Sequence, residues 1–306
     1  MNALVGYTGF VGSNLYAEGK FDYVFNSKNI EEAYGLKPDL LVYAGMRAEK
    51  YLANLYPDKD RELVKEAEKN ISQIAPKNLV LISTIDVFQK PENVNEETEI
   101  RIEGLSAYGR NRYELECWVR EEYPNACIIR LPALFGDNIK KNFIYDVIKR
   151  VPFRLTEKKY EELREKEPKL NLYYTLQENG FYQCRMLEKS EERDLKTIFE
   201  KLSFSAINFT DSRNVYQFYP LKYLWRDMQT LLRHQIPLCN MAVEPISASE
   251  LYEYVTGSIF KNEFQSSIVK YDFKTMYDRM YGGENGYIYR KNEILREIKE
   301  FVMNYV

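Results

Sequence analysis

Histidine and cysteine are scarce in this chain of 306 residues. There is one histidine, His234, and the four cysteines have no Cys-x-x-Cys spacing. Zinc sites and disulfide frameworks need such ligands or pairs at short, regular spacings, so we expect neither a metal site nor disulfides here. A lone histidine with no indicated partner is also a poor candidate for a catalytic base.

Long hydrophobic runs and a strong charge of one sign are missing as well. No apolar run approaches the ~20 residues needed to span a bilayer, so a membrane partner is not expected. The formal net charge is -3, which offers a nucleic acid no general electrostatic reason to bind. With 45% hydrophobic and 29% charged residues, the composition is that of an ordinary globular protein. We expect a cytoplasmic protein.

The first half of the chain alternates short apolar segments with helical patterns. The expected strands are Ala3–Val5, Tyr23–Phe25, Leu40–Tyr43, Leu79–Ile82 and Cys127–Arg130, with helices at Asp58–Ala75 and Tyr108–Tyr123 among the connecting segments. Strands that are apolar on both faces and alternate with helices predict a parallel sheet covered on both sides. The expected fold class is α/β, with a Rossmann-type doubly wound parallel sheet.

A charged stretch, TEKKYEELREKEPKLNLYYTLQENGFYQC, interrupts this alternation after about Phe153. We interpret it as an insertion, either a cap over the carboxyl ends of the strands or a surface excursion unrelated to ligand. Apolar residues at helical spacing in NEILREIKEFVMNYV predict a packed terminal helix. The expected domains are an NAD(P)-binding domain at 1–150, with later returns to the sheet near 204–240, and a smaller, partly inserted C-terminal substrate lobe at 151–203 and 241–306.

Three glycines spaced three apart, Gly6, Gly9 and Gly12, follow the first strand at once and open a helix. In this context the first permits a tight turn, the second lets the backbone approach a pyrophosphate, and the third lets helix and strand pack closely. The N–H groups at the helix start then face the phosphates. The pattern predicts a dinucleotide site made by Gly6, Thr8, Gly9, Phe10, Val11 and Gly12. A strand-to-helix turn without ligand is the alternative.

The end of the second strand indicates which cofactor fits. Asn26, Ser27 and Lys28 stand where a carboxylate would select NAD(H). Their donors and positive charge favour NADP(H) over NAD(H), unless Lys28 is simply a solvated loop lysine. The small residues Ala44 and Gly45 end the next strand and leave room for a passing adenosine or ribose.

Three further motifs carry a resemblance to a known family. They are VYAG at 42–45, LISTIDVF at 81–88, and SAYGRNRYELE at 106–116, where Tyr108 and Arg112 share one helix face. With the glycine turn, they make the chain resemble the extended short-chain dehydrogenase/reductase family, also called the NAD-dependent epimerase/dehydratase family. Within it the chain looks most like the dTDP-4-dehydrorhamnose reductases. The resemblance runs from Asn2 to about Gly136 and continues more weakly beyond.

The resemblance implies roles for several of these residues. Thr84 would hydrogen-bond the substrate carbonyl, and Tyr108 would be the acid/base. A phenol with an ordinary pKa of about 10 serves near neutrality only if a cation stabilises its phenolate, and the family supplies a lysine four residues later. Here that position is Arg112, which keeps the charge but never deprotonates. Contacts with the cofactor would come from Ser83, Tyr108, Arg112, Pro132 and Leu134.

Two departures from the family pattern narrow the chemistry. In the sugar-nucleotide 4,6-dehydratases the threonine precedes Asp-Glu, whereas Ile85 and Asp86 follow Thr84 here, so the acid of the elimination is missing. Ala133 replaces an asparagine that contacts the substrate diphosphate in the family's epimerases and dehydratases. The expected substrate contacts are therefore Thr84, Asp86, Asn142 and Arg213, with Lys140 and Lys141 as further candidates for the diphosphate.

Together these features predict an NADPH-dependent reductase of a carbonyl on a small-molecule substrate, a sugar or sugar nucleotide. One alternative is an epimerase that oxidises and re-reduces a sugar carbon. Another is a dinucleotide-binding sensor or assembly protein with impaired turnover, which the arginine at position 112 supports. The resemblance also implies a homodimer that pairs through helices including Tyr108–Tyr123.

Overall fold

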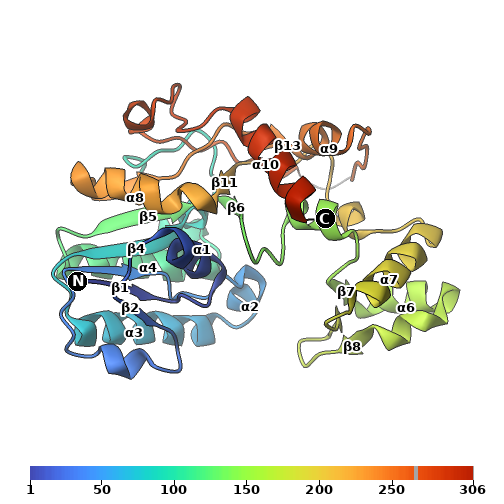
Figure 1. The fold of residues 1–306 in the computed structure, drawn as a ribbon, viewed down its shortest axis with the longest axis horizontal. Helices are drawn as coiled ribbons and strands as arrows, with labels where there is room; N and C mark the ends of the chain where they lie inside the picture. Colours follow the sequence, from blue (N-terminus) through green and yellow to red (C-terminus); the bar gives the residue numbers. More distant parts are fainter. Residues whose placement is uncertain (265–267, 306) are drawn as a thin grey trace. The chain divides into compact units, whose positions relative to one another are not determined.

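Six parallel strands form the central sheet of the protein, in the order β12-β5-β4-β3-β1-β2 (Figure 1). The computed structural model describes residues 1–264 and 268–305. The strands are β1 (Asn2–Val5), β2 (Tyr23–Phe25), β3 (Leu40–Tyr43), β4 (Leu79–Thr84), β5 (Cys127–Leu131) and β12 (Leu238–Asn240). The first five lie where the sequence predicted them, and β12 falls within the expected return near 204–240. The predicted doubly wound α/β fold is confirmed.

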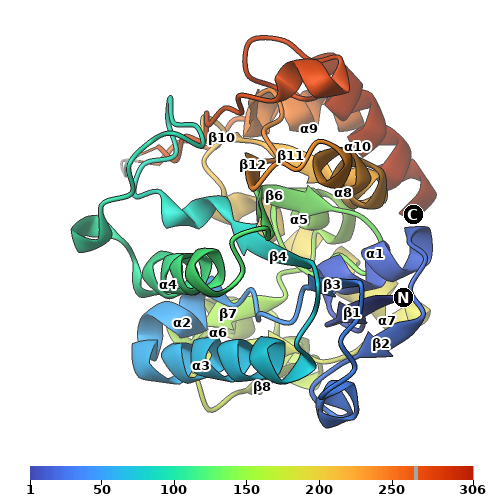
Figure 2. The ribbon, with the colours of Figure 1, turned by 90° about the vertical axis from the view of Figure 1, so that its left-hand side faces the viewer.

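Helices cover both faces of this sheet (Figure 2). One face carries α1 (Phe10–Glu18) and α8 (Leu224–Arg233), and the other carries α3 (Pro57–Ile74) and α4 (Ala107–Glu122). The α3 helix buries Val64, Ala67 and Ile71, which recur three or four residues apart and pack on buried residues of the strands. Since β1 lies between β2 and β3, the sheet reverses its strand order at β1, where doubly wound folds bind ligands.

The chain divides into two units, each with its own internal contacts. The first comprises Met1–Ile139, Val215–Ile246 and Val269–Glu297, and the second comprises Lys140–Asn214, Ser247–Ile268 and Ile298–Val306. Residues 140–150, which the sequence assigned to the cofactor domain, belong to the second unit. Residues 269–297, which it assigned to the substrate lobe, belong to the first.

The remaining elements of the first unit are short. They include α2 (Lys50–Leu55), β6 (Ala133–Phe135), β11 (Phe218–Pro220), β10 (Val215–Tyr216) and the 3-10 helices η1 (Ile30–Ala33), η2 (Ile85–Val87), η3 (Ile102–Gly104), η6 (Leu221–Tyr223) and η7 (Asp278–Tyr281). Strands β6 and β11 pair in parallel as a separate two-stranded sheet. Among the described residues, no helix combines the length and apolar character that crossing a bilayer requires.

The charged insertion folds around a small core within the second unit. Its elements are β7 (Arg154–Thr156), α6 (Glu157–Lys166), η4 (Pro168–Leu172), β8 (Tyr174–Leu176), β9 (Phe181–Cys184) and α7 (Lys189–Lys201). The strands form an antiparallel sheet in the order β7-β9-β8, and buried residues such as Leu155, Leu163 and Leu195 pack together beneath it. The insertion is thus an ordered subdomain, and its role as a cap stays a prediction.

Five elements complete the described chain. Four of them are helices, α5 (Phe143–Lys149), η5 (Ala206–Phe209), α9 (Ala248–Thr256) and the terminal α10 (Lys291–Tyr305), and the fifth is a short strand, β13 (Ile246–Ser247), before α9. The α10 helix buries Ile294, Leu295 and Ile298, as its apolar spacing predicts.

Candidate active site

The glycine turn between β1 and α1 is closely packed at two of its three glycines. Gly6 has φ +92°, and a Cβ there would lie 2.4 Å from the Ala44 oxygen. A Cβ on Gly12 would lie 2.0 Å from the Gly6 oxygen, so only glycine fits at either position. A Cβ on Gly9 would meet only the Gly6 oxygen, at 3.2 Å, and Gly9 is exposed. The first and third glycines therefore close the turn, and the second leaves its backbone open to a ligand.

The N-terminus of α1 leaves its first amide groups open. Gly9 is the N-cap, no side chain bonds to the cap, and the first turn contains no acidic residue. The Gly9 N–H donates to the Gly6 oxygen at 2.9 Å, which holds the turn against the strand. Helix-start amides without capping partners attract anions, because the helix dipole adds positive potential there. The residues present therefore fit the phosphates of a dinucleotide.

The end of β2 lies beside this turn, since the Gly6 N–H donates to the Phe25 oxygen at 2.7 Å. The Asn26 side-chain oxygen accepts from the Lys28 N–H at 2.8 Å, so it shapes the loop. Ser27 and Lys28 are exposed, and Lys28 has no ion-pair partner in the described parts of the chain. Ser27 and the ammonium of Lys28 remain open to solvent at the switch point of the sheet.

Tyr108 is held by groups from three separate elements. Its backbone N–H donates to the side-chain oxygen of Asn54 on α2 at 3.0 Å, the Thr84 side chain at the end of β4 lies close enough to lower the pKa of its phenol, and the Arg112 guanidinium lies over its ring at 4.6 Å from the centroid. The side chain is 7% exposed. The structure brings the predicted residues Tyr108, Thr84 and Arg112 together. It adds Asn54, which the sequence did not indicate because it lies 54 positions away.

Burial dominates the acidity of the Tyr108 phenol. Desolvation raises the pKa of Tyr108 above its usual value, while the charge of Arg112 and the hydrogen bond with Thr84 lower it by less, and the carboxylates of Asp86 and Asp60 raise it further. The expectation that the guanidinium would make this phenol acidic is therefore wrong in its net direction. The cation limits the rise, and the phenol is protonated at neutral pH.

Arg112 is itself buried and held by hydrogen bonds. Its Nη1 donates to Asp60 Oδ2 at 2.9 Å, and its Nη2 donates to Asp60 Oδ1 at 3.0 Å and to the Arg47 backbone oxygen at 2.7 Å. The Asn111 amide donates to the same Asp60 carboxylate at 2.9 Å. The sequence indicated a cation beside Tyr108 but did not indicate Asp60. Asp60 lies in the first turn of α3, the helix that packs against α4.

Ser83 faces a buried ionic network behind the site. Its hydroxyl donates to Glu116 Oε1 at 2.6 Å, and Glu116 also pairs with Arg130 at 2.6 Å and with Arg120 at 3.0 Å. Glu116 and Arg130 are at most 1% exposed. The Ser83 side chain therefore serves this network, and any cofactor contact at this position would involve the backbone.

Asp86, two residues after Thr84, forms an ion pair and accepts a hydrogen bond through its carboxylate. Lys50 pairs with its Oδ1 at 2.8 Å, and the Tyr271 hydroxyl donates to the same oxygen at 3.2 Å. Its own N–H donates to the Thr84 hydroxyl oxygen at 3.2 Å, which restrains the Thr84 side chain at the start of η2. The expected role of Asp86 in substrate binding stays a prediction.

The other expected contacts are distributed over both units. Ala44, Gly45 and Pro132 follow or flank strands of the first unit, Leu134 lies within β6, and all four are at least partly accessible. Asn142 belongs to the second unit, where its side-chain oxygen caps α5 by accepting from Ile144 N at 3.0 Å.

Arg213 also belongs to the second unit, and its guanidinium already has a protein partner. It forms a two-point pair with Asp211 at 2.9 and 2.7 Å and donates to the Phe264 backbone oxygen at 2.7 Å. Its expected contact with a substrate, like that of Asn142, stays a prediction.

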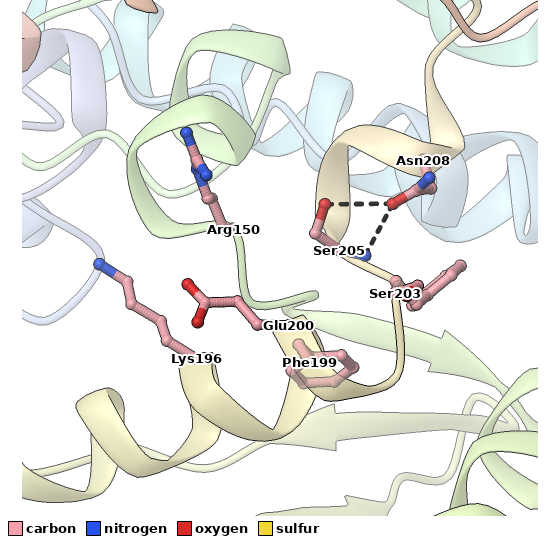
Figure 3. A pocket seen from close by; sticks show the side chains of 8 residues that line it. Arg150, Lys196, Phe199, Glu200, Ser203, Ser205 and Asn208 are labelled. Carbon is pink, nitrogen blue, oxygen red and sulfur yellow. Dashed lines mark hydrogen bonds between the residues drawn. The ribbon is translucent and has the colours of Figure 1, made fainter.

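A cavity of about 240 Å³ lies within the second unit (Figure 3). It is lined by Arg150, Lys196, Phe199, Glu200, Ser203, Phe204, Ser205 and Asn208. Figure 3 shows Ser205 and Asn208 bonded to each other on one side, and Lys196 and Glu200 on α7 at the other. None of the residues predicted for the active site lines this cavity.

A family model described as the RmlD substrate binding domain matches residues 4–159. No curated protein matches the chain. Among solved structures, dTDP-4-dehydrorhamnose reductase from Bacillus anthracis in complex with NADP matches with a TM-score of 0.64 and 14% identity, covering 99% of this chain and 97% of the other. RMD from Pseudomonas aeruginosa complexed with NADPH matches with a TM-score of 0.63 and 14% identity, covering 100% and 99%.

A third similar structure is the Bordetella bronchiseptica enzyme WbmG in complex with NAD and UDP. It matches with a TM-score of 0.66 and 12% identity, and the match covers 99% of this chain and 94% of the other. At identities this low the three matches show a shared fold over nearly the whole length of each chain.

Proposed function

Because the chain belongs to the family of the RmlD substrate binding domain, we propose that it is a reductase that uses NADPH to reduce a carbonyl on a sugar nucleotide. The family membership confirms the resemblance derived from the sequence and the predicted enzyme class, an NAD(P)-dependent oxidoreductase or epimerase of the extended short-chain type. The choice of reductase, cofactor and catalytic residues is the proposal.

One observation carries it. Tyr108, buried near Thr84, lies beneath a guanidinium in the same unit as a glycine turn whose second glycine is open to solvent. A phenol held in a fixed position can act as a general acid. Proton transfer from such a group typically accelerates a reaction by about 10²–10⁴-fold.

The cofactor would be held mainly by backbone groups. The amides at the start of α1 would bind the phosphates, and the open backbone at Gly9 would allow their close approach. Lys28 and Ser27 would contact a 2'-phosphate, which supports NADPH as the partner. The Bacillus anthracis and Pseudomonas aeruginosa structures contain NADP and NADPH, whereas WbmG contains NAD.

A bound nicotinamide supplies the hydride that forms the new C–H bond. Tyr108 gives its hydroxyl proton to the carbonyl oxygen, so that the O–H bond of the phenol breaks as the alcohol forms. Thr84 hydrogen-bonds the phenolate that remains, and the charge of Arg112 stabilises it. Because burial keeps the phenol protonated at neutral pH, Tyr108 begins the cycle in the form that a reductase needs.

The test is a reduction assay with NADPH and dTDP-4-dehydrorhamnose, followed by the loss of NADPH absorbance at about 340 nm. We expect one NADPH consumed per product formed, and a loss of at least about 100-fold in turnover for Tyr108→Phe with NADPH binding preserved. Tyr113→Phe, on the same helix, is the matched control and should retain activity. Conversion of a sugar nucleotide without any absorbance change would identify an epimerase.

A third outcome would identify a sensor. In this outcome NADPH binds, no 4-keto sugar nucleotide reacts, and Tyr108→Phe leaves the NADPH affinity unchanged. The protein would then be a sensor that binds the cofactor without catalysing a reaction.

A further inference from the structure

Asp60 is a buried carboxylate in the first turn of α3, and within the described residues the hydrogen bonds of its side chain go to the helix α4. Its side chain is 6% exposed, and that of its partner Arg112 is 4% exposed. Oδ2 accepts from Arg112 Nη1 at 2.9 Å and from the Asn111 amide at 2.9 Å, and Oδ1 accepts from Arg112 Nη2 at 3.0 Å. A carboxylate this deeply buried is stable only with such compensation.

These bonds determine the position of the guanidinium. A two-point pair defines the plane of the group, and the third bond, from Nη2 to the Arg47 backbone oxygen at 2.7 Å, prevents rotation within that plane. The result is a cation 4.6 Å from the centre of the Tyr108 ring. A lysine ammonium, as a point charge, has no plane that a carboxylate can align in this way.

The hydrogen bonds to Asp60 and Arg47 do not use every N–H group of the Arg112 guanidinium. Arginine has five N–H groups, and three are used by Asp60 and Arg47. The Nε hydrogen and one Nη1 hydrogen have no acceptor among residues 1–264 and 268–305.

We propose that Asp60 is a positioning residue of this active site, whose carboxylate holds the Arg112 guanidinium against the Tyr108 ring and keeps two of its N–H donors available to the ribose of the cofactor. The inference rests on the proposed function, since it assumes that a dinucleotide binds beside Tyr108. Asp60 touches neither the cofactor nor the substrate, and it acts only through Arg112.

A purely structural role makes a different prediction. The pair also joins α3 to α4, so removing Asp60 could weaken packing alone. In that case Asp60→Asn would lower the Tm while the folded protein kept wild-type affinity for NADPH. If Asp60 acts through Arg112, its removal has no further effect once the guanidinium is gone.

The experiment is a double-mutant cycle with Asp60→Asn, Arg112→Gln and the double variant, read out by NADPH titration. We expect each single variant to bind NADPH about 10-fold more weakly, because a charged hydrogen bond to the ribose is lost or misplaced. The double variant should be no weaker than Arg112→Gln. Asp58→Asn, an exposed carboxylate two residues earlier in α3, is the matched control and should bind like wild type.

A second readout separates the effects on the two bound molecules. Where the wild type turns over, Asp60→Asn should lower kcat and raise the KM for NADPH while the KM for dTDP-4-dehydrorhamnose is unchanged. Additive losses of NADPH affinity in the double variant, or wild-type affinity in Asp60→Asn, would overturn the proposal.

Two further results keep the test decisive. If Asp60→Asn does not fold, Asp60→Glu retains the charge but displaces the carboxylate by one methylene, and it should still bind NADPH several-fold more weakly. A wild type that binds NADPH but reduces no sugar nucleotide would refute the proposed reductase alone, because the binding cycle is still measurable. A wild type that binds neither NADPH nor NADH would refute both.

Discussion

Replacing Arg112 by lysine should damage this protein, although lysine is the residue that the extended short-chain family carries at this position. The guanidinium makes three hydrogen bonds, two to the Asp60 carboxylate and one to the Arg47 oxygen, in a site only 3% exposed. A lysine ammonium keeps the charge and can retain one bond to Asp60. It loses the second bond of the fork and the planar contact with the Tyr108 ring.

The magnitude follows from these losses. A hydrogen bond to a charged group contributes about 1.5–3 kcal/mol, and a desolvated cation–π contact about 1–2 kcal/mol. Because the ammonium retains part of the interaction, we expect Arg112→Lys to lower the free energy of unfolding by about 2–4 kcal/mol. For a unit of this size each kcal/mol corresponds to about 2–4 °C, so the Tm should fall by about 4–16 °C.

Thermal denaturation followed by circular dichroism, with NADPH titration on the same samples, measures both consequences. Arg110→Lys, two residues earlier on α4 and half-buried, is the control and should shift the Tm by less than about 2 °C. An Arg112→Lys variant as stable as wild type, with equal or higher turnover, would refute the reasoning, because the site would then need only a positive charge.

Three other predictions follow from the site. Gly12→Ala should prevent stable folding because its Cβ would lie 2.0 Å from the Gly6 oxygen. Gly9→Ala should fold normally but bind NADPH at least about 10-fold more weakly. Measuring the Tm and the NADPH affinity of both variants tests this difference. Burial raises the pKa of Tyr108 above its usual value, so the reduction rate should not decline between about pH 6 and pH 9. If the rate declines from near neutrality while NADPH binding does not, Tyr108 is not the proton donor. Lys28→Ala should lower the preference for NADPH over NADH by about 10-fold, measured as the ratio of the two dissociation constants, and an unchanged ratio would show that Lys28 does not contact the 2'-phosphate.

Much of the fold was predictable because its determinants are local. Each strand of the first half is a short apolar run, and each run carries its own signal. The turn at Gly6, Gly9 and Gly12 is equally local, because the absence of a side chain is what permits a φ of +92° at the first position and the close approach at the third. The family resemblance rests on the same local motifs, and the match over residues 4–159 confirms it.

The composition of the candidate site was only partly predictable. Tyr108, Thr84 and Arg112 were identified from their motifs, and the structure brings them together. The partners Asn54 and Asp60 were not identified, since nothing within their own segments distinguishes them from other polar helix residues. Ser83 was expected to face the cofactor, but its hydroxyl donates to Glu116, because α4 packs directly against β4.

The amino-acid sequence by itself determined the parallel sheet, the glycine turn and the identity of the proposed acid, because each depends on residues a few positions apart. The tertiary structure alone decided what surrounds that acid. Asp60 and Arg112 are 52 positions apart and meet only because α3 packs on α4. Packing also buries Tyr108, and desolvation, which no sequence pattern measures, raises the pKa of its phenol in spite of the adjacent cation.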